Sequence, residues 1–246
     1  MSSGYRDKLS SGRRAMAHLI HIWHERNAWS HKILPLVSEI LDLGRVHNSQ
    51  ISNLRNGKLS SPGPEVFLAL AQVNKILDQG IDLIRDQLED AHPELWKILQ
   101  ESSYPLKNDK GDPLSAGELF EIFAGLQPLP SSFDWFIEDE EASRLSEALS
   151  DHFCQNQPWR QCKARILNAY SVTKISRRDR FAEVIAGLKD YSAEELDGEL
   201  LDLYETSRKL SLFENGGPNA FLKELRDKVL IKENYFLKDD QQIKKL

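Results

Sequence analysis

The chain has 246 residues, of which 40% are hydrophobic and 28% charged, and its formal net charge is −6 at pH 7. This composition supports a packed core and excludes wholesale disorder. The longest uninterrupted apolar run covers only residues 66–71, whereas a membrane-spanning helix needs about 20 residues. We therefore expect no transmembrane segment. Two cysteines and no secretory signal pattern favour a cytoplasmic protein without a disulfide scaffold.

The charge is distributed unevenly along the chain. Residues 1–60 contain nine Lys or Arg and four Asp or Glu, a balance of +5, whereas the remainder carries 23 basic and 34 acidic residues, a balance of −11. This asymmetry suggests an anionic ligand for the first part and a protein partner for the second. Ordinary scatter of surface charge is the alternative explanation.

Helical periodicity dominates the N-terminal part of the chain. Between residues 14 and 25, Met16, Leu19, Ile20 and Trp23 recur at helical spacing and predict one buried face. We expect His18, His21 and His24 to lie on the opposite, outer face and to hold no metal. The helices predicted next cover residues 30–43, 48–55, 65–79 and 81–88. For the first of these, Ser30 is the predicted N-cap and Gly44 the C-terminal residue.

Two polar loops, at residues 104–113 and 127–132, flank the helix predicted at 115–126, where Ser115 and Glu118 have capping-box spacing. The helices predicted after them lie near 138–153, 159–169, 177–188, 193–212 and 218–230. No segment alternates with a period of two, so the expected fold class is all-α. We divide the chain into a basic helix-turn-helix-like module (1–90), a connecting segment with one short helix (91–132) and an acidic helical domain (133–246).

The most informative pattern is a helix that ends at Gly44, a short polar helix closed by Asn56 and Gly57, and a proline-bounded loop before an apolar helix. Residues 30–73 thereby resemble the helix-turn-helix of the lambda-repressor-like (XRE) superfamily. The resemblance implies that the second helix enters the DNA major groove. By this resemblance, the residues that contact bases are Asn48, Ser49, Gln50, Ser52 and Asn53. Arg45, Arg55 and Lys58 would contact phosphates, and Ile51 and Leu54 would anchor the helix to the core. A module that binds only protein, or a plain helical hairpin, remains open.

A second resemblance extends over most of the chain. It rests on residues 13–27, 29–32, 44–50 and 61–70, on Tyr170 with residues 177–182, and on residues 190–196. These segments resemble a cyanobacterial all-helical family of cyclic di-GMP receptors. The resemblance implies a dimeric, non-enzymatic signalling regulator that acts through a partner transcription factor.

Cyclic di-GMP carries two phosphates and two guanines, so a receptor needs cations, flat stacking faces and polar groups for the base edges. The candidate ligand-binding residues in the basic module are Arg6, Arg13, Arg14, Arg26, Trp29, Asn48, Gln50, Asn53 and Arg55. The polar residues of 48–55 suit a DNA base as well as a guanine. The alternative is therefore a dimeric, sequence-specific DNA-binding transcriptional regulator that reads DNA with the 48–55 helix.

Three clusters of charged residues or cysteines in the C-terminal half are expected to have a structural role, not a functional one. Arg177, Arg178 and Arg180 open a helix, and we favour internal salt bridges over a ligand phosphate as their partners. The acidic residues of 134–141 fit a helix start, with a docking face for a basic transcription factor as the alternative. Cys154 and Cys162 are interpreted as core or surface thiols. No motif for catalysis or for a cofactor is present, so we predict no enzyme activity.

Overall fold

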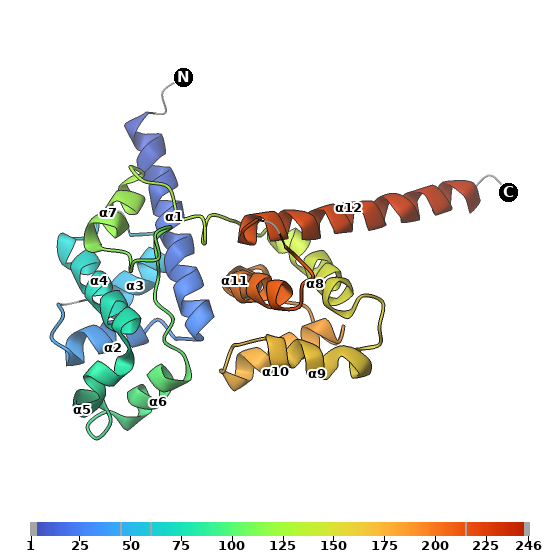
Figure 1. The fold of residues 1–246 in the computed structure, drawn as a ribbon. Coiled ribbons are helices and arrows are strands. Elements are labelled where there is room, and N and C mark those ends of the chain that lie inside the picture. Colours follow the sequence, from blue (N-terminus) through green and yellow to red (C-terminus); the bar gives the residue numbers. More distant parts are fainter. Residues whose placement is uncertain (1–3, 45, 60, 215, 244–246) are drawn as a thin grey trace. The chain divides into compact units, whose positions relative to one another are not determined.

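The computed structural model describes residues 4–44, 46–59, 61–214 and 216–243, the side chains of 233–243 excepted. Within these ranges the chain is all-α, as predicted, and its only extended pairing is an isolated bridge between Lys107 and Pro113. The chain forms two compact units, residues 1–134 and residues 135–246 (Figure 1). None of the helices in the described ranges is long and apolar enough to cross a membrane.

The first unit contains α1 (Tyr5–Asn27), α2 (Ile33–Ile40), α3 (Asn48–Arg55), α4 (Pro64–Gln79), the 3₁₀ turn η1 (Ile81–Ile84), α5 (Arg85–Leu88), α6 (Pro93–Glu101) and α7 (Ala116–Ala124). The second contains α8 (Asp139–Cys154), α9 (Trp159–Ala169), α10 (Ile175–Ile185), α11 (Ala193–Lys209) and α12 (Pro218–Ile243).

The core of the first unit forms where α1 and α4 meet their neighbours. Helix α1 packs against α3 and α7, and α4 packs against α2 and α7. The fully buried side chains of this core include Met16, Leu19, Ile20, Trp23, Leu34, Phe67, Leu70, Leu119 and Ile122. Because α7 contacts both α1 and α4, residues 91–132 belong to the first unit instead of connecting two domains, and they contain two helices, α6 and α7.

Two glycines allow α1 to cross the end of α7 at close range. A Cβ added at Gly12 would lie 2.6 Å from the carbonyl oxygen of Ile122 and closer still to the backbone nitrogen of Gly125. Gly125 caps α7 with φ 70°, a left-handed conformation that glycine adopts without strain. Any side chain at either position would separate the two backbones.

Two buried asparagines hold the irregular segment that links α6 to α7. Asn27 accepts hydrogen bonds from the Tyr104 backbone N–H (2.6 Å) and the Ser102 hydroxyl (3.1 Å). Asn74 accepts from the Leu106 N–H (2.7 Å) and donates to the Leu106 carbonyl oxygen (2.8 Å). Both asparagine side chains are fully buried. Their amides form the hydrogen bonds that the backbone of this segment would otherwise form within a helix or a sheet.

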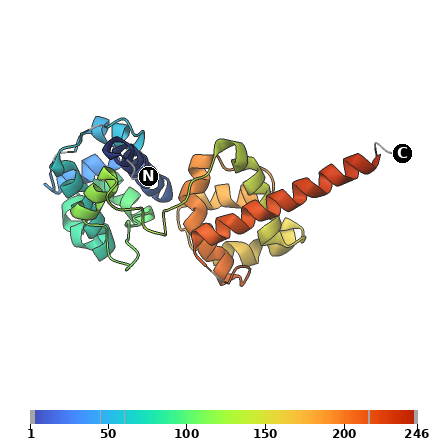
Figure 2. The same ribbon diagram turned by 90° about the horizontal axis from the view of Figure 1, so that it is seen from above.

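The second unit is built around α8, which packs against α9, α10, α11 and α12. Its core includes Leu145, Leu149, Phe153, Ile166, Phe181, Leu196, Leu200, Leu203, Phe221 and Leu225. Glu138 is the N-cap of α8, and Glu141 in its first turn pairs with Arg226 of α12. The second half of α12 continues past the other helices of this unit (Figures 1 and 2).

A buried ionic network joins α10 to α11. The Arg177 guanidinium is fully buried, donates two hydrogen bonds to Glu199 (2.6 and 2.7 Å) and donates a third to Asp202 (2.8 Å). The Tyr170 hydroxyl donates to the same Glu199 carboxylate. The carboxylates hold the pKa of Arg177 well above its usual range, against the effect of burial. The predicted internal salt bridge is therefore confirmed for Arg177.

Candidate nucleic-acid interface

Helix α3 has one buried side and one exposed side. Ile51 and Leu54 are 0% and 2% exposed, and α3 packs against α1, so the predicted core anchors are confirmed. Asn48, Ser49 and Asn53 are exposed. Amide and hydroxyl side chains can donate and accept hydrogen bonds at base edges. The exposed side of α3 therefore carries groups that can read a nucleic acid.

Local hydrogen bonds fix both ends of α3. The backbone N–H of His47, the N-cap, donates to Oε1 of Gln50 (2.9 Å), so Gln50 stabilises the start of the helix. At the other end, the N–H of Lys58 donates to the Asn53 carbonyl oxygen (2.8 Å) across Gly57, whose φ is 64°. Such closure by a left-handed glycine stops the helix within one turn. The exposed amides are thus held on a short, well-terminated helix.

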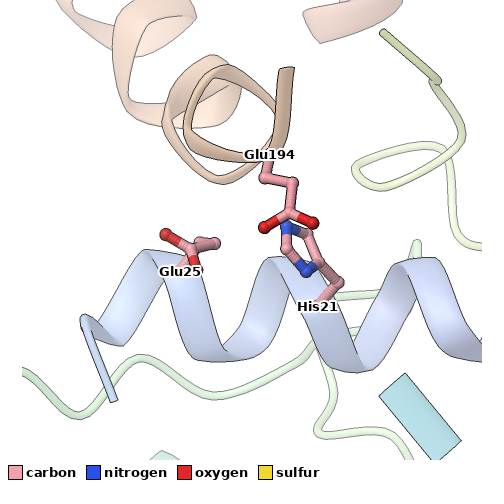
Figure 3. A group of neighbouring side chains, drawn as sticks. All are labelled: His21, Glu25 and Glu194. Atoms are coloured by element: carbon pink, nitrogen blue, oxygen red, sulfur yellow. The ribbon is translucent and has the colours of Figure 1, made fainter. Parts of the chain in front are cut away.

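Arg55 connects α3 to α1. Its Nε donates to Nδ1 of His21 (3.0 Å), and its Nη2 lies 3.1 Å from Oε1 of Glu25. His21 and Glu25 are one turn apart and project from the same side of α1 (Figure 3). Glu194, also drawn there, belongs to α11 of the second unit. Because its guanidinium contacts His21 and Glu25 of α1, Arg55 orients α3.

A groove of about 250 Å³ lies between α2 and the start of α3. Its lining residues are Lys32, Pro35, Leu36, Glu39, Val46, His47 and Asn48. Lys32 and His47 are exposed, and Lys58 is exposed beyond the other end of α3. Exposed lysines beside polar residues are typical of surfaces that contact a nucleic-acid backbone. Lys32 and His47 were not among the ligand residues predicted from the sequence, although both lie close to predicted helix starts.

The nine candidate ligand residues do not form a single site. Trp29 is only 5% exposed and its ring lies 6.4 Å from that of Trp23, so it is a core residue and not a stacking face for a ligand. The Arg26 guanidinium covers the ring of Tyr104 at 4.6 Å. This cation–π contact holds the Arg26 side chain against Tyr104.

The remaining arginines of the candidate set lie along the N-terminal half of α1. Arg6 and Arg14 are exposed, and Arg13 is half-buried. Of the proposed base-reading residues, Asn48 and Asn53 are exposed, and Gln50 is used as a cap. Arg45, proposed as a phosphate ligand, lies outside the described residues.

The expectation that three histidines share the outer face of α1 is wrong for His21, which is 9% exposed, and for His24. The His24 side chain is fully buried, and Nδ1–H donates to the Ile20 carbonyl oxygen (2.7 Å). Burial lowers the pKa of His24 to about 4, so the ring is neutral at pH 7. The periodicity argument failed because α1 is covered on two sides, by α3 and by α7.

Comparison with known proteins assigns no activity to this site. Residues 6–125 match a family described as a domain of unknown function (DUF8644), and residues 142–235 match a second domain of unknown function (DUF8645). No curated protein and no solved structure matches the chain. Each matched range lies within one of the two units, which agrees with the division at residue 134.

Proposed function

We propose that the first unit binds double-stranded DNA in a sequence-specific manner, with the exposed side of α3 in the major groove. The observation that carries the proposal is the two-sided character of α3: Ile51 and Leu54 are buried, while Asn48 and Asn53 are exposed. A helix anchored in this way presents its amides in a fixed orientation. Asparagine can contact the N6 and N7 atoms of adenine together.

The charge around α3 supports the same proposal. Lys32 and Lys58 are exposed near its two ends. Phosphate contacts position a protein on DNA, and base contacts specify the sequence. Residues 1–60 hold the chain's excess of basic side chains, although the whole chain is acidic. We therefore expect few phosphate contacts, and a binding free energy that depends strongly on base recognition.

The chain is proposed to act as a dimer on DNA. Modules that read DNA with one short helix cover a few base pairs, so two copies bind half-sites about one helical turn apart. The predicted recognition sequence is an inverted repeat whose half-site centres are roughly 10 base pairs apart. Regulation of transcription would follow from occupancy of such sites.

The proposal is tested by selecting duplexes from a random-sequence pool with the full chain. Binding of the enriched duplex is then measured by fluorescence anisotropy for wild type, Asn48→Ala and Asn53→Ala. Each substitution is expected to cost about 1–3 kcal/mol on the enriched duplex. Gln100→Ala, an exposed amide on α6, is the matched control and should bind as wild type does. Failure to enrich any sequence would contradict the proposal.

Cyclic di-GMP binding, with a transcription factor as partner, is the second candidate function. The observation that favours it is the series of arginines at the start of α1, where Arg6 and Arg14 are exposed. Isothermal titration of the full chain with cyclic di-GMP tests it, with GTP and cyclic di-AMP as controls. Selective, saturable binding that is lost in Arg14→Ala would support this function, and a flat titration would exclude it.

A further inference from the structure

The two cysteines of the chain meet inside the second unit. Cys154 is the last residue of α8, and Cys162 lies in the first turn of α9. Both are free thiols and are 7% and 1% exposed. Their Sγ atoms are 3.4 Å apart, so the two sulfurs are in direct contact. The sequence spacing of eight residues does not by itself predict this contact.

We propose that Cys154 and Cys162 form a reversible disulfide, which cross-links α8 to α9, by exchange with a small-molecule disulfide such as oxidised glutathione. In the first step, the Cys154 thiolate attacks one glutathione sulfur and expels glutathione thiolate, which leaves a mixed disulfide. In the second step, the Cys162 thiolate attacks Sγ of Cys154 and expels the second glutathione thiolate. The protein loses two electrons and two protons, and both glutathione thiols gain them.

The connection between the two helices suits such a cross-link. A disulfide requires a sulfur–sulfur bond of about 2.05 Å, so the sulfurs must approach by roughly 1.4 Å. Cys162 Sγ lies 3.4 Å from the carbonyl oxygen of Trp159 and 3.6 Å from that of Pro158, and a thiol is a weak donor that can give up either contact. Gln155 and Asn156 follow α8 with φ of 49° and 62°, which turns the chain sharply back toward α9. Side-chain rotation, with a small shift at this turn, closes the remaining distance.

A surface groove gives an incoming disulfide access to one of the two sulfurs. The groove has a volume of about 380 Å³. Its lining residues are Ser150, Asp151, Cys154, Asn156, Gln157, Pro158, Trp159, Ile185 and Ala186. Cys154 lines this groove and Cys162 does not. This difference gives the order of the two steps: Cys154 carries the mixed disulfide, and Cys162 resolves it.

The environment of Cys154 makes the exchange slow at neutral pH. Burial raises the pKa of the Cys154 thiol to about 12, and its contact with Cys162 adds to the increase. The thiolate is the attacking species. At pH values below this pKa, the fraction of thiolate increases about tenfold for each unit by which the pH rises. The exchange rate should rise about tenfold between pH 7 and pH 8, whereas the equilibrium between dithiol and disulfide must be measured after long incubation.

The test is the equilibrium of the full chain in glutathione redox buffers, in native solution and in 8 M urea. After acid quenching, alkylation with N-ethylmaleimide and mass spectrometry count the free thiols. The native chain is expected to convert from two alkylated thiols to an intramolecular disulfide, with an effective thiol concentration at least tenfold above that in urea. An equal or lower value in native solution would overturn the proposal, because the fold would then not favour the bond. Disulfide-linked dimers as the main product would also overturn it.

Two variants test the order of the steps. Cys162→Ser retains the groove-lining thiol and should accumulate the mixed disulfide with glutathione, because no second thiol resolves it. Cys154→Ser retains the enclosed thiol and should remain unmodified for much longer under the same conditions. Circular dichroism of each variant confirms that the helices are retained. Equal modification rates in the two variants would contradict the assignment of Cys154 as the entry point.

Discussion

Asp197 of α11 has a carboxyl group that the surrounding structure keeps protonated near neutral pH. Burial is the main cause that raises its pKa to about 8, and the nearby carboxylates of Glu141 and Glu194 raise it further. A backbone hydrogen bond with Ile137 and the charge of Arg226 act in the opposite direction. An unfolded Asp titrates near pH 3.9. Between about pH 4 and pH 8, the folded chain therefore retains a proton on Asp197 that the unfolded chain has released.

The consequence is a loss of stability as the pH rises. Between about pH 4 and pH 8 the unfolded state has fewer bound protons at Asp197, so the unfolding free energy of the second unit decreases. The decrease is about 1 kcal/mol from pH 7 to pH 8. We expect Asp197→Asn to remove this dependence, as measured by native-state hydrogen exchange of α11. A variant with the same pH slope as wild type would contradict the assignment.

His24 gives the first unit the opposite pH dependence. Burial lowers its pKa to about 4, whereas an unfolded histidine titrates near 6.5. The unfolded state takes up a proton first on acidification, so stability present above pH 6.5 is lost as the pH falls toward 4. We expect a loss of about 2 kcal/mol between pH 8 and pH 5 from this residue. His24→Phe should flatten the dependence, measured by hydrogen exchange of α1.

At the scale of elements, the crossing of α1 and α7 depends on the absence of a side chain at Gly12. A Cβ at this position would overlap backbone atoms at the end of α7, which cannot move as a flexible side chain can. Gly12→Ala is expected to destabilise the first unit by roughly 1–3 kcal/mol, as overpacking does. Urea-induced unfolding, followed by circular dichroism, gives this difference.

Gly117→Ala is the matched control for Gly12→Ala. Gly117 lies within α7, and an added Cβ would meet only the Ser115 hydroxyl at 3.9 Å. Alanine has the higher helix propensity, so this variant should be unchanged or more stable by up to about 1 kcal/mol. If Gly12→Ala were as stable as Gly117→Ala, the close crossing would be disproved.

Element positions were predictable where local signals agree. The bounds of the 48–55 and 159–169 helices match the structure, because Asn56 and Gly57 close the first and Pro158 precedes the second. Helix α6 was missed, although Leu95, Trp96 and Leu99 carry its core contacts. The long-range partners of Arg55 and Trp29 have no local signal in the sequence. Within the candidate set, Asn48 and Asn53 are exposed on α3, whereas Trp29 is a core residue.

For the whole molecule, the charge distribution determines how the proposed DNA binding should respond to salt. The net charge is −6, yet residues 1–60 have a balance of +5. Binding should weaken with salt, and the logarithm of the affinity should change by about 0.9 per phosphate contact for each tenfold change in salt. Lys32→Ala and Lys58→Ala should each reduce this slope by about 1 and weaken all duplexes alike. Lys223→Ala, an exposed lysine of the second unit, should change neither quantity.

The proposed reading of DNA bases by α3 is tested by combining Asn53→Ala with single base-pair substitutions in the selected duplex. We predict that wild type prefers the selected duplex over a scrambled one by at least about 10³-fold. At one base pair per half-site, Asn53→Ala should abolish the preference for the selected base. Base-pair substitutions elsewhere in the duplex should weaken binding of the variant and of wild type equally. Equal affinity of wild type for selected and scrambled duplexes would contradict the claim. Asn53→Ala with an unchanged preference at every base pair would also contradict it.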